Sequence, residues 1–153
     1  MASNRHLGRI IALQSLYEYE FRTQCEDGSV SIDEILTRNI ERYKDTVEDT
    51  GFIKKIVSGV QQKISELDAI IQPIAPEWPI EQIARVDRTI LRMAIFELRD
   101  LADIVPPKVV INEAVELAKA FGSDNSSKFV NGVLGTAYRK LIEGTDSDAK
   151  AKD

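Results

Sequence analysis

The stretch Pro107–Leu141, PKVVINEAVELAKAFGSDNSSKFVNGVLGTAYRKL, decides the fold of this chain. Proline suits the first position of a helix, and apolar residues then recur at helical spacing as far as Phe121. Gly122 is placed to end that helix, and Ser123–Ser126 offers side chains that accept hydrogen bonds from the N–H groups of a second helix. The pattern predicts two helices joined by a polar corner.

The polar corner combines three features that suit a nucleic acid. A helix N-terminus attracts phosphate, Lys128 adds a cation, and Phe129 offers a ring on which a base can stack. The alternative is that the polar residues are ordinary caps and that Phe129 belongs to the core. Two asparagines adjoin the apolar stripes. We interpret Asn112 as a buried structural amide, whereas Asn131, one turn from the corner, fits either role.

Helical periodicity continues through the rest of the chain, and strand-like alternation is scarce. We therefore predict an all-α fold of about seven helices in two packed groups. The proline-rich segment Pro73–Pro79 is expected to be the hinge between the groups, with Trp78 as a packed plug. Residues 1–142 form the single predicted domain, and residues 143–153 form a disordered tail.

Capping residues predict where the helices begin. Ser31 and Glu34 have the spacing of a capping box, which ties the first turn of a helix to the residue before it. The other expected starts are at Ser3 or Asn4, at Asp49 or Thr50, at Ser65 with Asp68, and at a short turn from Ile80 that leads into the helix containing Val86 and Leu98.

The composition is that of a globular protein, with 43% hydrophobic and 29% charged residues among 153. A lone cysteine, Cys25, cannot form an internal disulfide, which is consistent with a reducing compartment. Because no apolar run is long enough for a membrane span and no signal-peptide core is present, we expect a cytoplasmic protein. The net charge of -5 suits a basic protein partner, and RNA binding then requires positive charge gathered locally.

The predicted N-terminal helix provides that local positive charge. Arg5, His6 and Arg9 lie in its first turns, and no acidic residue occurs before Glu18. Cations are slightly unfavourable at a helix N-terminus, which indicates a purpose other than helix stability. The alternative to an RNA contact is an ordinary solvated helix end. The basic cluster is also small, because it contains only two arginines.

The sequence contains no motif typical of an enzyme active site or a metal site. It has one histidine and one cysteine, and no HExxH, CxxC or DxD spacing. No glycine-rich loop follows a strand, so a nucleotide cradle is not expected. Glu113 and Glu116 share a helix and are interpreted as solvated charges. We predict no catalytic residues, no metal and no cofactor.

Three runs of sequence resemble the NusB family of bacterial transcription antitermination factors. They are INEAVELAKAFGSDNSSKFVNGVL (Ile111–Leu134), RVDRTILRMAIFEL (Arg85–Leu98) and ALQSLYEYEF (Ala12–Phe21), in the order of the family's blocks. The resemblance implies an RNA-binding factor that binds the boxA element of ribosomal-RNA leader transcripts together with NusE, a small-subunit ribosomal protein. It further implies that the complex helps RNA polymerase to read through terminators.

The resemblance and the residue patterns together give an expected set of site residues. Asp87, Arg88, Arg92 and Glu97 lie off the apolar stripe of their helix, where the pattern alone predicts a solvated face. The resemblance instead assigns Asp87 to a protein-partner surface. The expected partner-binding residues are Tyr17, Asp87 and Arg92, and the expected RNA-binding residues are Arg5, His6, Arg9, Gln14, Asn125, Ser126, Lys128, Phe129 and Asn131.

Two other functions stay open at this point. NusB-like domains also form the N-terminal part of some ribosomal-RNA cytosine methyltransferases, although a chain ending near Asp153 has no room for a cofactor-binding α/β domain unless it is a fragment. The thin arginine cluster also fits a protein-interaction scaffold with weak RNA binding. A homodimer is compatible with the sequence.

Overall fold

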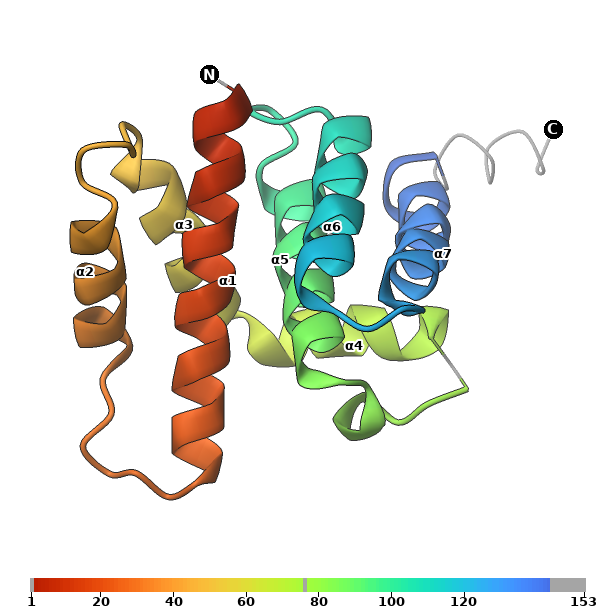
Figure 1. Ribbon diagram of the computed structural model, residues 1–153. Helices are drawn as coiled ribbons and strands as arrows, with labels where there is room; N and C mark the ends of the chain where they lie inside the picture. The colour runs from red at the N-terminus through yellow and green to blue at the C-terminus, as the bar shows by residue number, and fades with distance from the viewer. Residues whose placement is uncertain (1, 76, 144–153) are drawn as a thin grey trace, which may run out of the picture. The chain divides into compact units, whose positions relative to one another are not determined.

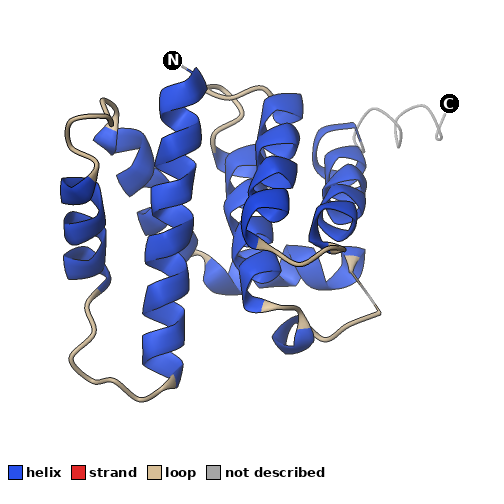
Figure 2. Ribbon diagram, viewed as in Figure 1, coloured by secondary structure: helices blue, strands red, loops and turns tan. Residues whose placement is uncertain are grey.

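The computed structural model describes residues 2–75 and 77–143, and every regular element within them is a helix, as Figure 2 shows. The predicted all-α fold with seven α-helices is therefore confirmed (Figure 1). The elements are α1 (Ala2–Gln24), α2 (Ile32–Arg42), α3 (Thr50–Gln62), α4 (Ile64–Ile74), the 3₁₀ turn η1 (Ile80–Gln82), α5 (Arg85–Asp100), α6 (Pro107–Phe121), α7 (Ser126–Tyr138) and the π-helical turn η2 (Arg139–Glu143).

The helices fall into two compact units, Met1–Gln62 and Lys63–Asp153. The predicted hinge at Pro73–Pro79 was wrong, because α4 belongs to the second unit and packs against α5. Its apolar face is buried in that unit through Leu67 and Ile71, neither of which is exposed to solvent. Among the described residues no helix is both long and apolar enough to cross a membrane.

Several helix starts are where the capping residues predicted them. The Ser31 hydroxyl accepts a hydrogen bond from the Glu34 N–H at 3.4 Å, which is one half of the capping box. The Asp49 carboxylate accepts from the Phe52 N–H at 3.0 Å and so caps α3. Pro107 occupies the first turn of α6, where its missing N–H costs no hydrogen bond.

Two other predicted starts were wrong. Helix α1 already begins at Ala2, so Ser3 and Asn4 lie inside its first turn. Helix α4 begins at Ile64, and Ser65 is its second residue and not its cap. In both cases a side chain that can cap is placed one or more positions inside the helix, because packing of the apolar stripe decides where a helix starts more strongly than one hydrogen bond does.

The first unit packs α1 against α2 and α3. A side chain at Gly8 would begin 3.2 Å from Ile53, so glycine lets α1 approach α3 closely. A short chain of buried hydrogen bonds joins α1 to α2. The Asn39 amide donates to the Ser15 hydroxyl at 3.0 Å, and that hydroxyl donates to the Ile11 carbonyl at 2.8 Å.

The second unit is built around α5, which packs against α4, α6 and α7. Every residue from Asp87 to Leu98 is buried. The predicted solvated face of this helix was therefore wrong, since a helix enclosed on several sides has no such face. The four charged residues that were predicted to lie on that face are buried, and they are Asp87, Arg88, Arg92 and Glu97.

Arg92 shows how such a charge is kept inside the unit. Its guanidinium donates two hydrogen bonds to the Asp68 carboxylate of α4, Nε to Oδ1 at 2.7 Å and Nη2 to Oδ2 at 2.9 Å. This bidentate geometry is the one that arginine and carboxylate groups favour, and it fixes α5 against α4.

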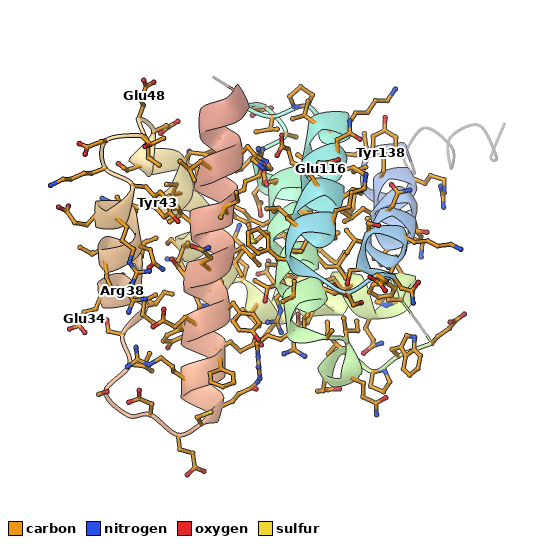
Figure 3. The ribbon with its side chains drawn as sticks, in the orientation of Figure 1. Glu34, Arg38, Tyr43, Glu48, Glu116 and Tyr138 are labelled. Carbon is orange, nitrogen blue, oxygen red and sulfur yellow. The ribbon has the colours of Figure 1, made fainter. Side chains whose placement is uncertain are left out.

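The apolar stripes of α6 and α7 form the core that the sequence predicted, with Val110, Leu117 and Leu134 among their buried residues. Asn112 and Asn131 are both exposed, so the interpretation of Asn112 as a buried amide was wrong. Glu116 of α6 is exposed beside Lys119, as expected of a solvated charge (Figure 3). From residue 144 onward the predicted tail lies outside the described residues.

Candidate nucleic-acid interface

The N-terminal basic cluster is held against α3. The guanidinium carbons of Arg5 and Arg9 lie 4.9 and 5.1 Å from the centre of the Phe52 ring, so both cations contact one aromatic side chain. Arg5 is half-buried, whereas Arg9 is 2% exposed. His6 and Gln14, the other predicted contacts on α1, are half-buried. Both arginines therefore lie on one face of α1, and of the two only Arg5 keeps substantial contact with solvent.

An aromatic pair lies further along α1. The Tyr17 and Phe21 rings are stacked, with centroids 6.4 Å apart and planes 6° from parallel, and Phe21 is 47% exposed. An exposed aromatic pair of this kind is typical of a protein-binding surface. Tyr17 was predicted to contact a partner, and the structure adds Phe21 beside it.

Charged residues beside the aromatic pair join α1 to α2. The Glu18 carboxylate accepts hydrogen bonds from Arg22 of its own helix and from Arg38 of α2, which Figure 3 shows projecting from that helix. The hydrogen bond from Arg38 and the second one from Arg22 hold the pKa of Glu18 below its ordinary value against the opposing effect of burial. These charges therefore tie α2 to α1.

Arg22 also holds the start of the connection between α1 and α2. It donates to the Asp27 carboxylate at 2.9 Å, and that carboxylate accepts from the Ser29 hydroxyl and from the Ser29 N–H at 3.0 Å. The hydrogen bond from the Ser29 hydroxyl, followed by that from Arg22, lowers the pKa of Asp27 to about 2.

In the second unit, the polar corner between α6 and α7 depends on a close approach of two residues. A Cβ atom on Gly122 would lie 2.5 Å from the Ser126 Cβ and 2.8 Å from the Ala118 carbonyl oxygen, so no larger residue fits there. The Gly122 backbone is extended, with a φ of -93°, so its lack of a side chain matters for space and not for conformation.

Ser126 and Asn125 have different roles at this corner. The Ser126 hydroxyl accepts a hydrogen bond from the Ser123 N–H at 2.9 Å, and Ser126 is 2% exposed. Asn125 precedes α7, but its side chain makes no capping hydrogen bond and is exposed. Ser126 therefore serves the fold of the corner, whereas Asn125 can reach a ligand.

Two hollows, each of about 280 Å³, include Phe129 in their lining. Trp78 and half-buried Phe129 border both of them. The first hollow, called here the Asp87 hollow, is lined by Trp78, Gln82, Ile83, Ala84, Asp87, Ser123, Asn125, Ser126 and Phe129. The second, the Lys128 hollow, is lined by Ile74, Ala75, Glu77, Trp78, Lys128, Phe129, Gly132 and Val133.

Trp78 is 52% exposed, so the prediction that it is a packed plug was wrong. Gln72 of α4 holds the backbone around it in place. The Gln72 amide donates to the Trp78 carbonyl at 2.8 Å and accepts from the Ile80 N–H at 2.9 Å. These bonds satisfy the backbone of a proline-bounded segment while its indole remains at the surface. Trp78 is the site residue that sequence reasoning missed.

Asp87 lies in the first turn of α5 and lines the Asp87 hollow. It is 8% exposed, and its Oδ1 atom has no hydrogen-bond partner among the described residues. A helix N-terminus favours a carboxylate, which explains its position but leaves its hydrogen-bonding capacity unused. Arg92, predicted for the same partner surface, is instead engaged by Asp68.

The structure thus groups the predicted corner residues around two hollows, and Asn131, exposed on α7, lines neither of them. Lys128 is exposed at its own hollow. Within residues 2–75 and 77–143 no three histidine, cysteine, aspartate or glutamate side chains form a group that can hold a metal ion.

Comparison with known sequences extends over most of the chain. The sequence model of the NusB family matches residues 6–139. A transcription antitermination protein NusB from Chloroflexus aggregans is 46% identical over 93% of this chain and 91% of its own length. A protein of the same name from Roseiflexus castenholzii is 45% identical over 94% of this chain and its entire length.

Solved structures resemble the fold over the same extent. NusB from T. maritima superposes with a TM-score of 0.79 at 27% identity and covers 94% of this chain and 96% of that one. A chain from a crystal structure of the antitermination factors NusB and NusE in complex with double-stranded RNA superposes with a TM-score of 0.76 at 27% identity, covering 91% and 98%. Likeness in sequence and in fold therefore extends over nearly the whole length of these proteins.

Proposed function

Because the chain belongs to the NusB family, as its three motifs predicted, we propose that it is an RNA-binding transcription antitermination factor. It binds the boxA element of ribosomal-RNA leader transcripts together with NusE, and the complex supports read-through by RNA polymerase. The observation that carries the proposal is the match over residues 6–139, joined to a NusB–NusE–RNA complex of the same fold.

The accessible basic and aromatic residues would meet the RNA. Arg5 is the arginine of the N-terminal cluster that can reach a phosphate, with Arg9 buried behind it over the same ring. At the corner, exposed Lys128 supplies a cation beside the Phe129 ring, which can stack on a base. His6, Gln14, Asn125 and Asn131 add accessible polar groups, and Ser126 supports the corner from inside.

Contacts with a protein partner would use different groups in each of the two units. The stacked pair of Tyr17 and Phe21 offers apolar area in the first unit, and Asp87 offers a negative charge in the second. A net charge of -5 favours encounter with a basic ribosomal protein such as NusE. Arg92 contributes indirectly, because its bond to Asp68 fixes the helix that carries Asp87.

A methyltransferase role is less well supported. The curated relatives are matched over 91% to all of their own length, and they are antitermination proteins and not methyltransferases. The proposal requires no covalent chemistry of this chain. A scaffold with weak RNA binding remains the second candidate, because one of the two N-terminal arginines is half-buried and the other is buried.

A gel-shift titration with boxA RNA, with and without NusE, tests the proposal. We expect NusE to increase the affinity of the chain for the RNA, and a scrambled RNA of the same length to bind less tightly. If no complex with boxA forms even when NusE is present, the RNA-binding function is wrong and the scaffold is favoured.

Two variants separate phosphate contact from base stacking. Arg5→Ala should reduce the slope of log affinity against log salt by about 0.7, the value for one phosphate contact on a single strand. Phe129→Ala should cost about 1–3 kcal/mol even at high salt, where stacking persists. Lys55→Ala, which removes an exposed cation from α3, serves as the matched control. Melting curves must first show that each variant is folded.

A further inference from the structure

We propose that Phe52 of α3 is a positioning residue for RNA binding, whose ring holds the guanidinium group of Arg5 ready to contact a phosphate. The inference rests on the proposed function in one respect, namely that an RNA phosphate is the group that Arg5 meets. It goes beyond that function because it gives a role in binding to a residue that is only 6% exposed and lies behind the arginine.

The contact between the ring and the cation is the first reason. The guanidinium carbon of Arg5 lies 4.9 Å from the centre of the Phe52 ring, within the range of a cation–π attraction. An arginine side chain has many rotamers, and restricting them at the moment of binding weakens the affinity for a ligand. The ring restricts Arg5 before any RNA arrives.

The way in which Arg5 is held is the second reason. Within the described part of the chain no hydrogen bond or ion pair engages its guanidinium group. A carboxylate in place of the ring would also hold the arginine, but it would neutralise the charge and occupy the N–H groups. The ring attracts the cation through its face, so the charge and the N–H donors remain available to a phosphate.

The ring itself is fixed in its place. The Phe52 N–H donates to the Asp49 carboxylate at 3.0 Å, which anchors the first turn of α3. A Cβ atom on Gly8 would lie 3.2 Å from Ile53 Cγ1 and 3.7 Å from Phe52 Cδ2, so glycine lets α1 lie directly against this part of α3. This close approach brings the arginine-bearing face of α1 onto the ring.

The alternative is that Phe52 serves only the packing of α1 against α3. The two roles differ in what they require of the ring. Packing requires its shape, whereas holding a cation requires the negative electrostatic potential of its face. Fluorine atoms withdraw electrons from the ring and remove that potential with only a small change of shape. Fluorinated phenylalanines at this position therefore separate the two roles.

The first experiment measures RNA affinity as the potential of the ring is reduced. The whole chain is prepared with Phe52 replaced by phenylalanines that carry from one to five fluorine atoms. Fluorescence anisotropy then gives the affinity for dye-labelled boxA RNA and for oligouridylate of the same length, without NusE. We expect the affinity for both RNAs to fall as fluorine atoms are added, to about three- to tenfold below that of the unaltered chain.

Two controls separate positioning from packing. In the Arg5→Ala background the same fluorinated rings should change RNA affinity by less than about twofold, because the side chain to be positioned is absent. The same series at Phe96 of α5 is the matched control. That ring is also buried and has a cation, Lys63 Nζ, 5.9 Å from its centre, and its fluorination should leave RNA affinity unchanged. Melting curves must show that each variant is folded.

A second experiment uses the chain without RNA. NMR relaxation of the Arg5 Nε–H group reports how freely the guanidinium group moves on the picosecond to nanosecond timescale. We expect restricted motion above the unaltered ring and increasing motion as fluorine atoms are added to Phe52. This measurement tests the hold of the ring on Arg5 independently of any RNA affinity.

Several results would overturn the inference. Full RNA affinity of the folded, most fluorinated variant would show that binding does not use the potential of the ring, and an equal loss in the Arg5→Ala background would assign the effect to packing. Equal motion of Arg5 above every ring would show that Phe52 does not hold it. If neither RNA binds, the inference fails together with the proposed function. Equal binding of boxA RNA and oligouridylate contradicts only the proposed boxA preference, because a phosphate contact carries no sequence information.

Discussion

Replacement of Gly122 by alanine is the sharpest test of how the corner between α6 and α7 is built. The new methyl group would begin 2.5 Å from the Ser126 Cβ and 2.8 Å from the Ala118 carbonyl oxygen. Both distances are well below van der Waals contact, so the chain must shift around the corner. Ser126 is 2% exposed and its hydroxyl is held by the Ser123 N–H, so its side chain cannot move aside without losing that hydrogen bond.

The expected loss of stability follows from these contacts. Forcing extra volume into a packed site costs about 1–3 kcal/mol. Displacing the Ser126 hydroxyl also breaks its hydrogen bond with the Ser123 N–H, worth about 0.5–1.5 kcal/mol. Alanine restricts the unfolded chain more than glycine does, which offsets the loss by up to about 1 kcal/mol. We therefore expect Gly122→Ala to lower the free energy of unfolding by about 0.5–4.5 kcal/mol.

Urea unfolding followed by the emission of Trp78 measures the effect in the second unit. Gly132→Ala is the control, because a Cβ there has no neighbour within 4 Å and α7 should gain about 0.5–1 kcal/mol from the better helix former. Ser126→Gly in the Gly122→Ala background should recover part of the loss. An unchanged urea midpoint for Gly122→Ala would refute the close approach described here.

Three further predictions follow from buried or ionised residues. Val133→Asp places an unpaired charge at a 6% exposed position, so it should cost at least about 3 kcal/mol, and an unaltered urea midpoint would contradict that. Arg92→Met leaves the Asp68 carboxylate without its counter-charge and should lower the free energy of unfolding in urea by about 1–3 kcal/mol. This loss should be smaller when Asp68→Leu is added. Asp27 has its pKa lowered from 3.8 to about 2, so the unfolded chain binds more protons between these values and stability rises with pH there; Asp27→Asn should flatten that rise in urea midpoints taken across the window.

The sequence predicted the parts of the fold that depend on periodicity and on local hydrogen bonds. The stripes of α6 and α7, the cap at Ser31 and the proline at the start of α6 all involve residues within a few positions of each other. Such patterns are set by helix geometry. The order of the three family motifs predicted the arrangement of the helices and the partners. Helix α1 could be recognised in the same way, although not its first residue.

The parts that were wrong depend on distant neighbours. A single helix pattern reports one stripe, so it gave no sign that α5 is enclosed by three other helices or that Arg92 has its partner 24 residues away. Trp78 was read as a plug because large apolar side chains are usually buried. The hydrogen bonds by which Gln72 holds the backbone on both sides of Trp78 could not be predicted from the sequence either.

The buried link from Asn39 through Ser15 to Ile11 has a consequence for the pairing of α2 with α1. Apolar side chains alone tolerate a slip of one helical turn, about 5.4 Å, because ridges and grooves repeat along a helix. After such a slip the Asn39 amide would lose its acceptor and lie unpaired among apolar groups, whereas the Ser15 hydroxyl would keep its bond to Ile11 of its own helix. One buried polar contact thus favours a single register of α2 against α1.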